Sequence, residues 1–422
     1  MSDWIFQKPK VCTKPLRTLF ADTPFTGIRL NKMKLIRNIT TDDLQHSQRL
    51  MAVTTPIPSM FSWRYLKQTD NNGVTTNVTP NVQITKPLDQ GGCGSCWAFA
   101  ITMALADRYL IANAKKNKKI KLPVLSPLWL MNQTVALMDA GSSANTCNNG
   151  GDPYMGCKWL EQKNNGLKLE TCWPYSIIKN RNPKWVNPLP LPKDCCVTCC
   201  GTKATDSKIL FNVQPGSTRS LVSNTNLATI ATIQREIMTN GPVICGFIVF
   251  NDFLGIGGSR NYWRDIAPYT NAPHEGVYIC SNSSNSNFNG GHAVTVTGWG
   301  TCKNLKNREG KLIRYWEVRN TWGTIQADAG YGRVAFSTDV SANAALEFDV
   351  PRQLFGNDQF SGGMMTMMPA SLPENYKTKN DQVENYSYNE VKCKKNTNYF
   401  SLLLFIIAIV LLIIVVIKLF EN

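Results

Sequence analysis

The chain has 422 residues, of which 43% are hydrophobic, and a formal net charge of +16 at pH 7. This length and hydrophobic share allow a substantial core, in one large domain or two smaller ones. A basic chain suggests nucleic acid or an anionic surface as a partner, but its Lys and Arg residues are scattered apart from short runs at 115–121 and 392–395. We therefore expect mostly solvated surface and no nucleic acid, which stays an alternative.

Cysteine is abundant, with 14 residues, many of them clustered at 93–96, 147–172 and 195–200. Such clusters indicate disulfides and an oxidising compartment. The run at 195–200 is also compatible with zinc, but it has no second ligand pair at a typical spacing. We expect disulfides or crowded thiols there, and no metal or other cofactor.

Residues 1–56 form a basic N-terminal extension that lacks the apolar core and the cleavage-site pattern of a signal peptide. Part of it, 30–51, has a helical pattern. A domain is expected to begin at Ile57. The stretch 68–80 is polar and rich in Asn, Thr and Gly, which predicts a surface loop.

The most informative stretch is 90–99, which reads Gln-Gly-Gly-Cys-Gly-Ser-Cys-Trp-Ala-Phe. Its glycines allow a tight turn before Cys96, and the run 97–114 is rich in Ala, Leu, Ile and Met, which predicts a helix. Cys96 then lies at a helix N-terminus, where backbone N–H groups and the helix dipole stabilise a thiolate. Acyl transfer by a thiolate also needs a proton partner and an oxyanion donor, and the Gln90 amide is close in sequence. A buried structural cysteine is the alternative.

Three further elements follow from local pattern. Ser126 is a plausible N-cap with Pro127 at the first helical position. Residues 229–239 read as an amphipathic helix, and an apolar strand then runs through Phe250.

Only three histidines occur, at 46, 274 and 292. His292 follows two glycines, which give access to it, and it begins an alternating, strand-like run that continues to Gly300. A second polar and aromatic run, Tyr-Trp-Glu-Val-Arg-Asn-Thr-Trp-Gly at 315–323, contains Asn320 and Trp322.

These runs, together with Cys-Trp-Pro-Tyr-Ser-Ile at 172–177, occur in an order that resembles papain-like cysteine proteases, and cathepsin B-like enzymes most closely in wording. The resemblance covers about residues 57–351. It implies an α+β fold of two domains: a helical half led by the Cys96 helix and a β-barrel-like half that bears His292 and Asn320. An extended peptide would bind between them.

The resemblance also implies the roles of individual residues. Cys96 would be the nucleophile, His292 the general base and Asn320 the amide that orients the imidazole. Gln90 would donate to the oxyanion, and Trp322 would shield the bond between His292 and Asn320 and line the leaving-group side. These roles predict a peptide hydrolase that acts on protein or peptide substrates.

Further residues are carried over from the same resemblance. Gly150 and Gly151 would line the wall that pairs with substrate backbone, although one extra Asn precedes them and an ordinary turn is the alternative. Asp349 falls where the floor of the S2 pocket lies in relatives, or it is a surface residue. Cys93 is expected to pair with Cys147. Residues 178–194 contain no histidine, which favours an endopeptidase over a carboxydipeptidase.

We predict four segments: an N-terminal extension at 1–56, a catalytic domain at 57–355, a linker at 356–398 and a transmembrane helix at 399–419. The extension is either a pro-segment that blocks the site or an unremarkable addition. The methionine-rich run at 364–368 in the expected linker has no evident role.

The C-terminal apolar run is long enough to span a bilayer. More Lys residues precede it than follow it, which predicts a single-pass anchor with the catalytic domain on the cytoplasmic side. This orientation conflicts with the cysteine count and leaves five glycosylation sequons unused. A protein encoded by a large DNA virus that assembles in the cytoplasm would reconcile both features.

The alternative from another class is a membrane-anchored binding or structural protein on a catalytically inactive papain-like scaffold. The complete set of Gln90, Cys96, His292 and Asn320 argues against it.

Overall fold

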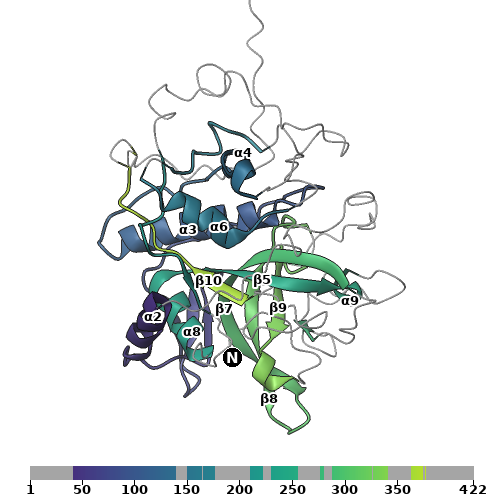
Figure 1. Ribbon diagram of the computed structural model, residues 1–422. Coiled ribbons are helices and arrows are strands. Elements are labelled where there is room, and N and C mark those ends of the chain that lie inside the picture. Colours follow the sequence, from purple (N-terminus) through teal and green to yellow (C-terminus); the bar gives the residue numbers. More distant parts are fainter. Residues whose placement is uncertain are drawn as a thin grey trace, which may run out of the picture.

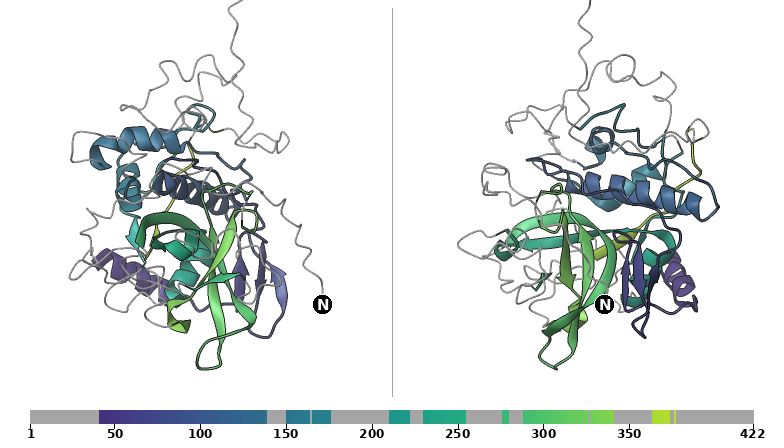
Figure 2. Two further views of the ribbon diagram at one scale, coloured as in Figure 1. Left: turned by 90° about the vertical axis from the view of Figure 1, so that its right-hand side faces the viewer. Right: turned by 180° about the vertical axis from the view of Figure 1, so that it is seen from behind.

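The computed structural model of the protein describes residues 41–138, 150–163, 165–175, 210–221, 230–254, 276–279, 288–325, 327–340, 363–373 and 376. Figures 1 and 2 show a helical half on one side of the molecule and a sheet with its own helices on the other. The fold is therefore α+β, as predicted.

The helical half contains α3 (Cys96–Ala114), α4 (Pro127–Met138) and α6 (Pro153–Leu160). The predicted helix 97–114 is confirmed as α3, which is buried from Cys96 through Ile111. It lies between α4 and α6 on one side and β5 (Val243–Phe250) and β7 (Phe288–Lys306) on the other. A helix that is apolar on all sides suits this central position.

Local predictions elsewhere are also confirmed. The Ser126 hydroxyl accepts a hydrogen bond from Trp129 N, and α4 begins at Pro127. The predicted amphipathic helix is α8 (Ile230–Asn240), and β5 ends at Phe250 as expected.

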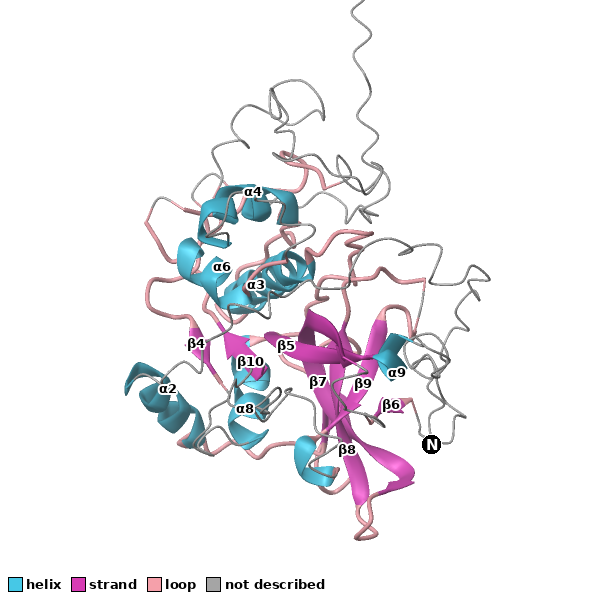
Figure 3. Cartoon of the chain, turned by 45° about the vertical axis from the view of Figure 1, so that its right-hand side comes forward, coloured by secondary structure: helices cyan, strands magenta, loops and turns pink. Residues whose placement is uncertain are grey.

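The remaining elements belong to the sheet half (Figure 3). They are α2 (Thr41–Met51), α9 (Asn251–Leu254), a 3₁₀ turn (Ser337–Asp339) and the strands β1 (Met60–Ser62), β2 (Lys67–Thr69), β3 (Thr75–Asn77), β4 (Arg219–Ser220), β6 (Val277–Tyr278), β8 (Leu312–Arg319), β9 (Tyr331–Ala335) and β10 (Gly363–Thr366).

The strands follow the order β3-β2-β1-β7-β5-β10-β4, with β8 on the other edge of β7 and β9 and β6 beyond it. The long strand β7 pairs with β5 and then β1 along one edge, and with β8 along its other edge. Over the described residues the path ends at β3 and β4 without closing. The expected β-barrel-like half is thus an open sheet organised around β7.

Strand β10 corrects the predicted linker. Met364 pairs with Cys245 of β5, and Met364, Met365 and Met367 are buried. The chain then crosses to the helical half, where Ala370 N donates to Asn212 O over 3.1 Å. Residues 363–373, together with Tyr376, therefore fasten the two halves to each other. The methionines fill core positions, for which their flexible side chains are suited.

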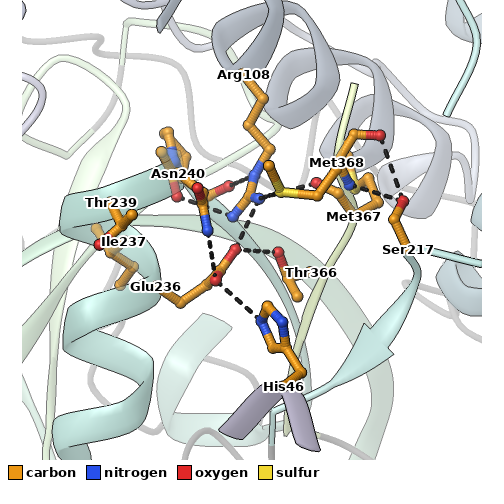
Figure 4. A network of polar contacts seen from close by, with 12 residues as sticks. His46, Arg108, Ser217, Glu236, Ile237, Thr239, Asn240, Thr366, Met367 and Met368 are labelled. Carbon is orange, nitrogen blue, oxygen red and sulfur yellow. Dashed lines mark hydrogen bonds and ion pairs between the residues drawn. The ribbon is translucent and has the colours of Figure 1, made fainter. Parts of the chain in front are cut away.

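Helix α2 lies inside the predicted N-terminal extension, and it packs on the sheet half. Its Leu50 is buried in the core of that half, and His46 Nε2 lies 3.1 Å from Glu236 Oε2 on α8. Glu236 in turn pairs with Arg108 of α3 over 2.8 Å (Figure 4). Arg108 is 12 residues beyond Cys96, about 18 Å along the helix, so α2 docks far from the predicted nucleophile.

Two segments predicted from sequence lie wholly outside the described residues: the cysteine run at 195–200 and the transmembrane helix at 399–419. Among the helices that the structure does describe, none combines the length and apolar character that crossing a membrane requires.

Candidate active site

Cys96 is the first residue of α3, and it carries a thiol that is in no disulfide. Ser95 occupies the N-cap position but makes no side-chain capping bond, so its hydroxyl leaves the first N–H groups of the helix to other partners. The backbone N–H of Ala293, next to His292, donates to Cys96 Sγ over 3.3 Å. The thiol therefore contacts the strand that carries the predicted base.

His292 and Asn320 come from neighbouring strands. His292 lies on β7, where Thr295, three residues further on, pairs with Arg319 of β8, and Asn320 directly follows β8. His292 Nε2 is 2.7 Å from Asn320 Oδ1. An amide oxygen only accepts, so Nε2 carries the proton, and in the neutral ring Nδ1 holds the lone pair that a base needs.

Two aromatic rings enclose this imidazole. Trp322 stacks on His292 with ring centroids 4.7 Å apart and an interplanar angle of 27°. Phe247 of β5 meets the same ring edge-on at 5.7 Å. The stacked indole covers one face of the His292 ring, as expected if it shields the bond to Asn320.

The site is buried, with Cys96 0% and His292 2% exposed. Burial raises the pKa of Cys96 to about 12, against the opposing effect of N–H groups from Ala293, Trp97 and Cys96 itself. Burial lowers the pKa of His292 to about 4, partly offset by Asn320. At neutral pH this closed arrangement holds a neutral thiol and a neutral imidazole. Because burial causes both shifts, entry of water or substrate favours the ion pair.

The His292 shift predicts how stability depends on pH. Its pKa is lower in the folded than in the unfolded chain, so the unfolded state binds more protons between about pH 6.5 and 4. The stability from neutral His292 is fully present above pH 6.5 and is lost as pH falls, by up to about 3 kcal/mol. Urea unfolding of the wild type and His292→Gln should therefore give curves that diverge in this window. Parallel curves would contradict the prediction.

Gln90 joins the nucleophile loop to the Asn320 segment. Its backbone N–H donates to Thr321 O over 2.8 Å, and its side-chain Oε1 accepts from the Thr321 hydroxyl. Its Nε2 donates to Cys93 O over 2.7 Å. An amide nitrogen has two protons, so one remains for an oxyanion beside Cys96.

Of the two predicted wall glycines, Gly151 lies against α3. Gly150 has φ +65°, in the left-handed region that favours glycine. A Cβ on Gly151 would fall 2.3 Å from the indole of Trp97, the residue after Cys96. Cys93 is disulfide-bonded, but its predicted partner Cys147 lies outside the described residues, so that pairing stays a prediction. Asp349 lies outside them as well.

Sequence reasoning assigned no role to Thr321, Ala293 or Phe247, although each contacts a predicted site residue. Thr321 and Ala293 adjoin Asn320 and His292 inside the motifs, and this adjacency was the only signal. Tyr175 was noted only as part of a motif. Its hydroxyl lies 2.7 Å from both Gln90 O and Ser95 Oγ.

Comparison with known proteins bears on this geometry. The model of the papain family of cysteine proteases matches residues 74–349. The chain belongs to this family. Among its relatives, probable cysteine proteinase 224L of Invertebrate iridescent virus 6 is 25% identical over 319 residues, or 67% of this chain and 62% of that protein.

A cathepsin B-like relative is more similar in sequence. Cathepsin B-like cysteine proteinase 5 of Caenorhabditis elegans is 32% identical over 270 residues, which cover 60% of this papain-family chain and 66% of that protein. The chain thus spans slightly less than two thirds of the length of these relatives. Among solved structures, proCathepsin B S9 from Trypanosoma congolense is 19% identical, with a TM-score of 0.47 over 83% of this chain and 89% of that one.

Proposed function

We propose that the protein is a cysteine endopeptidase that uses Cys96, His292 and Asn320. The observation that carries the proposal is the 2.7 Å bond from His292 Nε2 to Asn320 Oδ1, on a strand whose next residue binds the Cys96 thiol. It leaves His292 Nδ1 as the basic nitrogen. Membership of the papain family supports the same assignment.

The proposed reaction starts when substrate admits polar groups to the buried site. The proton of Cys96 moves to His292 Nδ1, and the thiolate attacks the scissile carbonyl. The Cys96 backbone N–H and the second Gln90 amide proton would stabilise the oxyanion. His292 then protonates the leaving amine, which leaves a thioester. Water, deprotonated by His292, hydrolyses the thioester and regenerates the thiol.

The alternative, a binding protein on an inactive scaffold, is favoured by the burial of Cys96 and His292. Burial alone does not distinguish an inactive site from a latent one. Entry of water or substrate would be enough for the neutral Cys96 thiol and His292 imidazole to form an ion pair. The chemistry of Cys96 therefore separates the two readings.

We also propose that residues 399–419 anchor the enzyme in a membrane with its catalytic domain on the cytoplasmic side. The apolar composition of this run and the three Lys residues at 392–395 support the proposal. Relatives from invertebrate iridescent viruses, among them proteinase 224L, are compatible with a large DNA virus as its source.

One experiment tests both proposals. The full chain in membranes is treated with a biotinylated form of the epoxide inhibitor E-64, with the membranes intact and permeabilised. We expect a covalent label on Cys96 together with cleavage of an internally quenched peptide. A comparison of labelling in intact and permeabilised membranes reports on which side of the membrane the catalytic domain lies. A chain that neither labels at Cys96 nor cleaves peptide contradicts the peptidase, and extraction of the chain by alkaline carbonate contradicts the anchor.

A further inference from the structure

Tyr175 contacts both segments that border the predicted oxyanion site. Its side chain is fully buried and packs edge-on against Phe99 of α3, with ring centroids 4.6 Å apart. Its hydroxyl oxygen is 2.7 Å from the backbone carbonyl of Gln90 and 2.7 Å from Ser95 Oγ. One phenol thus joins the predicted oxyanion donor to the residue before the nucleophile.

The direction of these two hydrogen bonds follows from the groups involved. A carbonyl oxygen only accepts, so the single Tyr175 hydroxyl proton goes to Gln90 O. Ser95 must then donate its own proton to Tyr175. The other oxygen near Ser95 Oγ is Cys93 O at 3.4 Å, too long to compete with a contact of 2.7 Å. Burial holds the pKa of Tyr175 well above its ordinary value, so the phenol remains a donor.

This direction matters because serine at an N-cap normally accepts a hydrogen bond from the N–H group two or three residues on. The Ser95 side chain makes no such bond. The N–H group three residues on, that of Ala98, is satisfied by the backbone, since it donates to Ser95 O over 2.9 Å. The second position, Trp97 N–H, instead favours the charged form of the Cys96 thiol, as the Cys96 N–H does. A Ser95 hydroxyl released from Tyr175 would compete for Trp97 N–H.

We propose that Tyr175 is a positioning residue of the oxyanion site, which fixes the Gln90 backbone and withholds the Ser95 hydroxyl from the N-terminus of α3. The proposal rests on the proposed peptidase function. The described hydrogen bonds of the Tyr175 hydroxyl go to Gln90 O and Ser95 Oγ. It acts through Gln90, which carries the side-chain donor, and through Ser95, which precedes the backbone donor of Cys96.

The test compares Tyr175→Phe, Ser95→Ala and the double variant, each as the full chain with active sites titrated by E-64. Loss of a whole oxyanion donor costs about 10²–10³-fold in kcat. Loss of its positioning by Tyr175→Phe should cost about tenfold in kcat with KM within about twofold. Ser95→Ala should remain near wild type, because the bond from Tyr175 to Gln90 persists. The double variant should exceed Tyr175→Phe in kcat, because no hydroxyl is left to migrate.

Two controls separate positioning from stability. Tyr109, which lies on α3, is also buried, and its hydroxyl donates to Asn212 O over 2.7 Å. Tyr109→Phe should lower the melting temperature about as much as Tyr175→Phe but leave kcat unchanged. Alkylation of Cys96 by iodoacetamide forms no oxyanion, so its rate should change less than threefold in the double variant, which has no Ser95 hydroxyl to compete for Trp97 N–H.

The outcomes are distinct. Wild-type kcat in Tyr175→Phe, or a double variant no faster than Tyr175→Phe, overturns the role of Tyr175 while the peptidase stands. A tenfold loss in alkylation in the double variant also overturns it, since the thiol would then be impaired without any competing hydroxyl. A wild-type chain without peptide cleavage or E-64 labelling overturns the proposed function, and the role of Tyr175 falls with it.

Discussion

Replacing Cys96 by alanine is expected to lower kcat/KM for peptide hydrolysis by at least about 10⁴-fold. The thiol is the only proposed nucleophile, and the donors that remain in Cys96→Ala can stabilise a charge but cannot form the thioester. The fold should persist, because alanine keeps the helix and loses only the sulfur and its bond from Ala293 N. Steady-state cleavage of a quenched peptide, with a melting curve for each variant, measures both effects.

A matched control is available in the same half of the molecule. Cys157 on α6 is also fully buried and contacts the Met367 sulfur at 3.8 Å. Cys157→Ala should cost stability through lost packing but leave kcat/KM within about threefold, because its sulfur packs against Met367 and has no part in the proposed mechanism. Equal activity losses in the two variants would show that Cys96 acts through packing. Retained cleavage in Cys96→Ala would remove it from the mechanism.

The same experiment extends to the partners of the thiol. His292→Ala should approach the loss seen in Cys96→Ala, and the double variant should be no worse than either, because the two groups act as a unit. Asn320→Ala should cost about 10²-fold, since it removes the acceptor that fixes the proton on His292 Nε2. An additive double variant would indicate that cysteine and histidine act in separate steps.

The elements that sequence predicted well are those whose pattern is local. Helix α3 is mostly apolar, α8 is amphipathic and β5 is a short apolar run, and each has a signal within its own residues. The helical pattern of α2 was recognised, but its packing on the sheet half and the strand β10 were missed, because their partners are distant in sequence. The methionines of β10 acquire a role only against β5, more than 100 residues earlier.

The candidate site shows the same division. The motifs around Cys96, His292 and Asn320 indicated the reacting groups, because their residue types are distinctive. The contacts among Tyr175, Ser95 and Gln90 join residues 80 and 85 positions apart, and a tyrosine in a turn gives no sign of them. The sequence also did not indicate that the sheet stays open, because this depends on how β5 and β1 share one edge of β7.

Two charges inside α3 had no sequence interpretation, although they lie in its most buried part. Asp107 and Arg108 are both fully buried. Asp107 pairs with Arg319 of β8 over 2.7 Å, and Arg319 immediately precedes Asn320. Arg108 pairs with Glu236 of α8. The nucleophile helix is therefore tied to the sheet half by two ion pairs of opposite polarity.

Arg108→Met is expected to destabilise the fold by about 3–5 kcal/mol, since removal of one member of a buried pair leaves the other charge uncompensated. The Arg108 guanidinium donates to Glu236 Oε1 and Met367 O, each over 2.8 Å, and to Gly241 O over 3.0 Å (Figure 4). It thus joins α3, α8 and the segment after β10. Urea unfolding at pH 7 measures the loss.

The pH dependence of the stability loss in Arg108→Met provides a second measurement. Burial raises the pKa of Glu236, but the Arg108 charge and hydrogen bonds from His46 and Thr366 outweigh it and hold that pKa well below its usual range. Wild-type stability from Glu236 is therefore present above its unfolded pKa and is lost as pH falls below it. In Arg108→Met the opposing charge is gone, so the carboxyl should take up its proton at a higher pH and the loss should be largest at neutral pH.

Two further variants make the prediction specific. Arg108→Met with Glu236→Leu should recover part of the stability, because neither charge is then buried alone. Glu309→Gln breaks the 3.0 Å pair with Lys311, whose side chains are 68% and 76% exposed, and should cost at most about 1 kcal/mol because solvent screens it. If the double variant were no more stable than Arg108→Met, the guanidinium would act mainly through its bonds to backbone carbonyls. The tie between α3 and the sheet half would then be a set of hydrogen bonds, with the buried charge of Glu236 held by His46 and Thr366.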